Sequence, residues 1–178
     1  STQSRSSAAS DVYKRQVILQ TGLEITATGT AYTFENDKIK LRAVFTSPLL
    51  LEDPVLVSRP CTYVDFDVVR KAETADVTID LQLSADLVRY TPGAVVGGAY
   101  RTDSFSYAVM GKADQKPLGN SGDNITIDWG YAYLAVQDAY SRVGFDRGGE
   151  QLTASVKLGT QYGHGELVVA YDLSLIHI

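Results

Sequence analysis

Apolar and polar residues alternate along most of this chain with a period of two, the pattern of β-strands that are buried on one face. In residues 76–84 the apolar positions are Val77, Ile79, Leu81 and Leu83. The same alternation occurs in residues 38–45 and 152–158. The residue types that favour a pleated surface are also concentrated in segments 23–28, 30–36, 62–69, 104–110, 124–136 and 166–171. The pattern predicts about nine or ten strands.

Residues with turn chemistry separate these segments. They occur at Asn36-Asp37, at Gly97-Gly98, and in segments 119–123 and 147–149. The proline-containing stretch 47–60 and the stretch 111–123 are predicted to be loops or crossings between sheets. No stretch shows the apolar repeat of an amphipathic helix. We therefore expect an all-β fold, an antiparallel β-sandwich of the super-sandwich type.

The two ends of the chain resemble translated sequencing adapter. The segment SSAASDVYKRQ at 6–16 and the segment LSLIHI at 173–178 correspond to two halves of one transposase-type read adapter. Such ends are set aside in fold reasoning. We expect residues 1–16 to be disordered and 173–178 to add nothing to the fold. Residues 17–172 are expected to form one sandwich domain, a truncated fragment of a larger chain.

The composition of the chain excludes some classes of partner. The formal net charge is −5, which argues against nucleic acid or an anionic membrane as a partner, because both require a basic surface. No apolar run is long enough to span a bilayer. Cys61 is the only cysteine, so no internal disulfide can form, and we expect it to be a small buried residue.

Few residues qualify for catalysis. His164 could act as a general base, but glycines at 163 and 165 favour a tight turn. Ser58 has no nearby base in the sequence. Asp65 and Asp67 are expected to point to one face of a strand about 7 Å apart, a spacing compatible with inverting glycoside hydrolysis. The apolar alternates Val64, Phe66 and Val68 instead favour a solvated outer face.

Oxygen ligands for calcium could come from Asp53, Asp65, Asp67, Asp123 and Asp128. None of these residues has the spacing of a calcium-binding loop. The sequence therefore predicts no metal site, no cofactor and no catalytic residue.

Residues 128–133 form the most distinctive cluster. They hold Asp128, the only tryptophan, Trp129, and the tyrosines Tyr131 and Tyr133 around Gly130. Large rings with a polar atom suit a protein interface or sugar stacking, and a core aromatic pair beside a bulge is the structural alternative. Arg59 could bind a carboxylate across a domain boundary or remain a loop charge. These residues are the candidates for an interface or active-site rim.

Three segments resemble a known family. They are TATGTAYTFEND at 26–37, FTSPLLLEDPVLVSRPCTYVDFDVV at 45–69 and GDNITIDWGYAYLA at 122–135. Together they resemble the N-terminal β domain of the glutaminase A family. That resemblance implies a large multidomain hydrolase, secreted or periplasmic, which converts L-glutamine to L-glutamate and ammonia. It also implies that the β domain precedes a C-terminal (α/α) toroid catalytic domain.

Two functions are therefore open. The first is a non-catalytic domain that packs against the catalytic domain of the same parent chain. The alternative is a free-standing carbohydrate-binding sandwich, with Trp129 as its sugar platform and a sugar or another small molecule as its ligand.

Overall fold

The computed structural model of the protein describes residues 18–71, 77–117, 119, 128–137, 141–158 and 162–172. Its strands are β1 (Leu19–Ile25), β2 (Gly29–Glu35), β3 (Ile39–Thr46), β4 (Cys61–Arg70), β5 (Val77–Ser84), β6 (Val95–Arg101), β7 (Ser106–Lys112), β8 (Tyr131–Val136), β9 (Arg142–Asp146), β10 (Gln151–Leu158) and β11 (Tyr162–Asp172). The described helical segments are α1 (Pro54–Val57) and the 3-10 turn η1 (Ala85–Leu87). The adapter-like ends, 1–16 and 173–178, lie outside the described residues.

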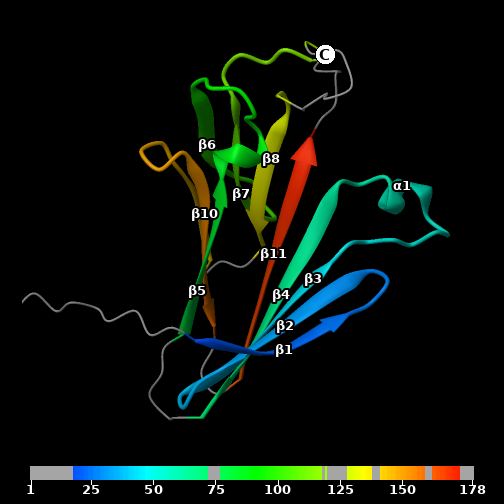
Figure 1. The fold of residues 1–178 in the computed structure, drawn as a ribbon, viewed down its shortest axis with the longest axis vertical. Coiled ribbons are helices and arrows are strands. Elements are labelled where there is room, and N and C mark those ends of the chain that lie inside the picture. Colours follow the sequence, from blue (N-terminus) through cyan, green and yellow to red (C-terminus); the bar gives the residue numbers. More distant parts are fainter. Residues whose placement is uncertain are drawn as a thin grey trace, which may run out of the picture.

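The strands form two antiparallel sheets (Figure 1). The large sheet has eight strands in the order β1-β2-β3-β4-β11-β8-β7-β6, and the small sheet has three in the order β5-β10-β9. The strands β4 and β11 are central in the large sheet although they lie far apart in the sequence. The observed fold is an all-β sandwich, which confirms the fold class predicted from the period-two pattern.

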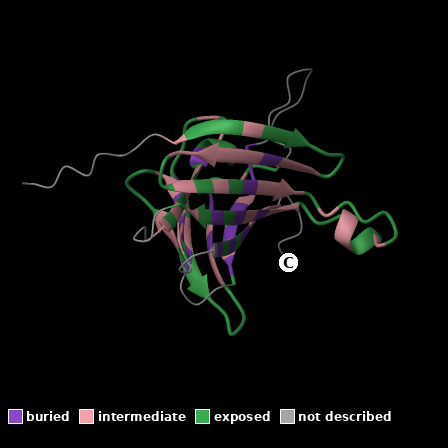
Figure 2. Cartoon of the chain, turned by 90° about the horizontal axis from the view of Figure 1, so that it is seen from below, coloured by how far each residue is buried: buried purple, intermediate pink, exposed green. Residues whose placement is uncertain are grey.

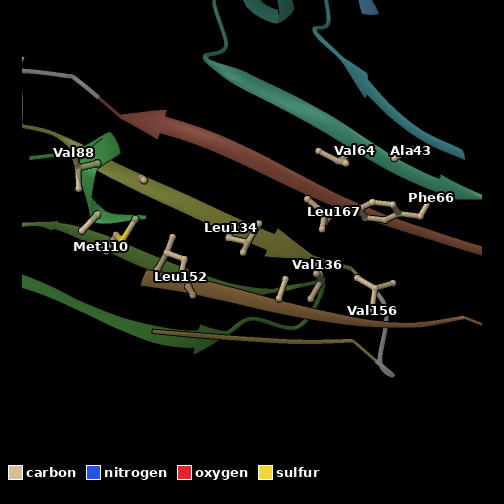
Figure 3. Close-up of a cluster of buried hydrophobic side chains, with 14 of the residues drawn as sticks. Ala43, Val64, Phe66, Val88, Met110, Leu134, Val136, Leu152, Val156 and Leu167 are labelled. Carbon is tan, nitrogen blue, oxygen red and sulfur yellow. The ribbon is translucent and has the colours of Figure 1, made fainter. Parts of the chain in front are cut away.

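The core lies between the facing sides of the two sheets (Figure 3). The large sheet contributes Val64 and Phe66 from β4, Leu167 from β11 and Leu134 from β8, and the small sheet contributes Leu152 from β10. Full burial of such a side chain stabilises the fold by about 1.5–3 kcal/mol. Alternate residues of the same strands must therefore point away from the core.

Several predicted strands are confirmed to within two residues at each end. The segments predicted at 76–84, 38–45 and 152–158 appear as β5, β3 and β10. The strands β6 and β9 are not among the predicted segments. The predicted loop at 47–60 is confirmed, because it occupies the whole interval between β3 and β4. It includes the short helix α1, which begins at Pro54 after the N-cap Asp53.

The turn predicted at Gly97-Gly98 is wrong, because both residues lie inside β6. A Cβ atom on Gly97 would lie 2.4 Å from the carbonyl oxygen of Val109 and 2.8 Å from the ring of Phe145. Glycine is therefore required here by a close approach between strands and sheets, and no chain reversal is involved.

The turn predicted around His164 is also wrong. Residues 163–165 lie inside β11, paired with β4. A Cβ atom on Gly165 would lie 2.5 Å from the Val156 side chain of β10. The glycine thus allows the small sheet to approach β11 closely, and His164 on the other side of the strand points outward.

The small sheet covers only part of the large one. Its strands β10 and β9 pack on β11, β8, β7 and β6. The edge strand β1 lies at the far end of the large sheet, and most of it is exposed (Figure 2). Leu23 and Ile25 in this strand are 52% and 74% exposed. The segment around α1 projects away from both sheets in the same view. Apolar side chains of β1 therefore remain open to solvent.

The central position of Leu152 gives the first prediction. Its side chain is fully buried in β10, so Leu152→Ala should lower the free energy of unfolding by about 2–5 kcal/mol. The control Gln82→Ala alters an exposed side chain of β5 and should change the free energy of unfolding by less than about 0.5 kcal/mol. Urea unfolding of the two variants measures both values, and equal losses would contradict the assigned core.

Candidate functional site

The outer face of the large sheet carries a row of side chains in which large ones flank small ones. Register places Tyr63 of β4 opposite Val168 of β11, Val168 opposite Ala135 of β8, and Ala135 opposite Tyr107 of β7. The short side chains in the middle form the floor of a pocket of about 340 Å³. Tyr63 and Phe105 are among its lining residues, as are the polar residues Gln137 and Glu166.

Aromatic side chains continue beside this pocket. The rings of Tyr100 and Tyr107 stack with their centroids 5.4 Å apart, and Phe105 and Tyr133 lie 5.8 and 6.3 Å from Tyr107. We call Tyr100, Phe105, Tyr107 and Tyr133 the outer aromatic cluster. Tyr100 and Phe105 are exposed, and Tyr107 and Tyr133 are half-buried. Such rings on one sheet face offer apolar area with hydroxyl groups at its border, which suits a binding surface.

A second group of side chains lies next to the pocket and is called the His164 cluster. It consists of Asp65, Asp67, His164 and Glu166, from β4 and β11. Register pairs Asp67 with His164 and Asp65 with Glu166. The Nδ1 atom of His164 lies 2.9 Å from Oδ1 of Asp67, and its Nε2 atom lies 4.0 Å from Oδ1 of Asp65.

The surroundings of His164 favour its charged form. The hydrogen bond with Asp67 raises the pKa of the imidazole, partial burial opposes this, and the charges of Asp67, Asp65 and Glu166 raise it further. The carboxylates do point to the solvated outer face, as the sequence predicts. Their proximity to His164 was not predicted, because it depends on the pairing of strands that are distant in the sequence.

The expectation that Trp129 provides an exposed platform is wrong, because its side chain is only 8% exposed. Strand alternation does not extend through Gly130, whose φ of 97° lies in the left-handed region and ends the extended chain before β8. Tyr131 and Tyr133 lie within β8 and are half-buried on its outer face. Trp129 therefore does not share a surface with Tyr133.

Asp128 is buried in a polar network and has a structural role. Its carboxylate accepts hydrogen bonds from the Lys112 ammonium, the Thr91 hydroxyl and the backbone N–H groups of Tyr90 and Thr91. Burial opposes ionisation of Asp128, but these hydrogen bonds outweigh it and hold the pKa well below its usual range. Asp128 thus fastens the turn at 90–91 to β7.

Arg59 lies elsewhere, in the exposed loop after α1. It borders a depression of about 290 Å³ together with Cys61 and Tyr171. Cys61 is a free, half-buried thiol, so the expectation of full burial is wrong. Ser58, next to Arg59, donates its hydroxyl hydrogen to the carbonyl of Val55.

The five candidates from the sequence therefore do not form one site. Tyr131 and Tyr133 lie on the outer face, Asp128 and Trp129 are buried, and Arg59 belongs to a loop. The residues that the structure does bring together are the outer aromatic cluster and the His164 cluster. Among the described residues, no helix is long and apolar enough to cross a membrane.

Comparison with known proteins gives one family. Residues 28–164, about three quarters of the chain, match the family described as a domain of unknown function (DUF5127). The match includes β2 to β10 and therefore most of both sheets. No curated protein matches the chain.

The buried pair of Asp128 and Lys112 gives the second prediction. In Asp128→Asn the Lys112 ammonium would stay buried without its partner, which should lower the free energy of unfolding by about 3 kcal/mol. The control Asp103→Asn replaces an exposed carboxylate in the turn between β6 and β7 and should be nearly neutral.

The same pair predicts a pH dependence. The pKa of Asp128 is lower in the folded than in the unfolded state, so its stabilisation is present above the unfolded pKa and is lost as the pH falls below it. Acid unfolding between about pH 4 and pH 2 should therefore be less steep in Asp128→Asn than in the wild type. Identical slopes would show that the carboxylate does not stabilise the fold through its charge.

Proposed function

We propose that this chain, which belongs to the DUF5127 family, is a non-catalytic β-sandwich domain of a glutaminase A-like multidomain hydrolase. In this proposal it packs against a C-terminal (α/α) toroid domain of the same polypeptide. That domain performs the hydrolysis of L-glutamine to L-glutamate and ammonia. The resemblance of segments 26–37, 45–69 and 122–135 to glutaminase A proteins supports the parent assignment.

The observation that carries the proposal is the apolar surface near β1. Leu23 and Ile25 are exposed there, and Leu50 and Leu51 are exposed in the loop after β3. This loop starts beside β2, because the backbone N–H of Ser47 donates to the carbonyl of Thr28. Exposed apolar side chains at the open end of a sheet are typical of a surface that another domain covers.

The bonding of the two candidate catalytic groups supports a non-catalytic role. The Ser58 hydroxyl donates to a carbonyl within its own loop, and the His164 imidazole is bonded to Asp67 on the large sheet. Nucleophilic catalysis requires the base to contact the nucleophile. These residues therefore do not form a catalytic pair.

A carbohydrate-binding module remains the second candidate, because one observation favours it. The outer aromatic cluster borders a pocket with Gln137 and Glu166 at its edge, and sugars bind to rings flanked by polar groups. If the domain binds carbohydrate, the sugar would stack on Phe105 and Tyr107, and the buried Trp129 would not contact it.

The third prediction concerns activity. The purified chain should release no ammonia from L-glutamine above a buffer blank, because the proposal places the reacting groups in the C-terminal domain. The positive control is the same domain joined to a glutaminase A toroid, assayed under the same conditions. Ammonia release by the chain alone that is abolished in His164→Ala would contradict the non-catalytic assignment.

The fourth prediction tests the surface near β1. The chain should bind a hydrophobic dye and self-associate weakly, and the double variant Ile25→Ser, Leu51→Ser should do less of both. The control is Tyr100→Ser, which removes an exposed ring from the outer face. Analytical ultracentrifugation and dye fluorescence measure the effect.

The two candidate functions give opposite outcomes in this experiment. A stronger effect of Tyr100→Ser, together with glucan or galactan binding that is lost in Tyr107→Ala, would favour the carbohydrate-binding module. An effect confined to the Ile25 and Leu51 variant, without sugar binding, is the result expected for a domain that packs against a partner.

A further inference from the structure

We propose that Asp65, His164 and Glu166 form a binding site for a divalent transition-metal ion, with zinc preferred, on the outer face of the large sheet. One ligand atom from each of these residues lies within 4.8 Å of the others. The ligand atoms of a tetrahedral zinc ion are about 3.4 Å apart. Small rotations of these three side chains, two exposed and one half-buried, would therefore close the site with no movement of the backbone.

The hydrogen bond between His164 and Asp67 prepares the imidazole for a metal. In the neutral imidazole the Nδ1 atom donates its hydrogen to Oδ1 of Asp67 at 2.9 Å, and the lone pair is on Nε2. A metal ion at Nε2 would displace the proton that this atom carries in the charged form. The Nε2 atom faces Asp65 at 4.0 Å. Histidine ligands of zinc usually donate their second ring N–H to a carboxylate in this way. Asp67 is thus a positioning residue, outside the ligand set.

Two central strands hold the ligands. Asp65 is paired in register with Glu166, and Asp67 with His164. The intervening residues Phe66 and Gly165 face the core, where Val156 and Leu158 of β10 lie against Gly165. Ligands on a packed sheet keep their positions better than ligands on a loop.

The charges of the cluster favour a cation. Asp65, Asp67 and Glu166 place three carboxylates around one imidazole, and no Lys or Arg of the described residues forms an ion pair with them. The opposite strand β3 brings Arg42 into register with Asp67, but the Arg42 guanidinium bonds to Glu24 instead. A divalent ion would offset the mutual repulsion of these carboxylates.

The ligand types select the metal. Imidazole nitrogen is a poor ligand for calcium and magnesium, whereas a mixed set of one imidazole and two carboxylates suits zinc and its transition-metal neighbours. Three protein ligands leave a fourth position for water or an exogenous ligand. Glu166 also lines the pocket beside Tyr63 and Phe105, so the ion would lie at the border of that pocket.

The fifth prediction tests this site in the whole chain. After treatment with a chelator, isothermal titration with zinc should show one ion per chain. His164→Ala should abolish saturable binding, and Asp65→Asn and Asp67→Asn should each weaken binding by about 10–100-fold. His177→Ala, which removes the other histidine, should leave the affinity unchanged. Circular dichroism verifies that each variant is folded.

Cobalt provides an independent readout. Co²⁺ should give a visible d–d absorption band in the wild type that is displaced by Zn²⁺ and is absent in His164→Ala. Calcium at the same concentration should not displace cobalt. The proposal is overturned by a wild type that shows no saturable binding at millimolar zinc, by His164→Ala that retains it, or by His177→Ala that loses it.

Discussion

The packing of β10 against the inner faces of β11, β8 and β7 is the constraint on which the other features depend. It buries Val64, Phe66, Leu134 and Leu167 against Leu152 and Val156. Because side chains alternate between the two faces of a strand, this burial also decides which residues face outward. A slip of one residue between β4 and β11 would exchange the two sets and place carboxylates in the core.

The residues that face outward include the His164 cluster and the outer aromatic cluster of the large sheet. Asp65 and Asp67 point outward because Val64, Phe66 and Val68 point inward. His164 points outward because its neighbours Gly163 and Gly165 are buried, and Gly165 lies against Val156 of the small sheet. The outer aromatic cluster follows from the inward positions of Ala108 and Met110 in β7. The surface near β1 has a different origin, since the small sheet does not extend over that strand.

The local alternation of apolar and polar residues is sufficient to predict the fold class and, in many strands, which residues face the core. Residues 77–83 alternate as expected, and Asn36 forms the predicted turn by accepting hydrogen bonds from the N–H groups of Lys38 and Ile39. The site could not be predicted in the same way, because Asp67 and His164 meet only through the non-local pairing of β4 with β11. The glycines at 97 and 165 do not form turns, because close packing between the sheets requires the same residue type as a turn does.

The most direct test of the account is the register of β4 against β11 in solution. Nuclear Overhauser effects between backbone protons of the isotope-labelled chain report which residues lie opposite each other. The account predicts contacts that join Asp65 to Glu166 and Asp67 to His164. Contacts shifted by one residue, which would join Phe66 to Glu166, would contradict it, because Asp65 and Asp67 would then lie on the opposite face of the sheet from His164.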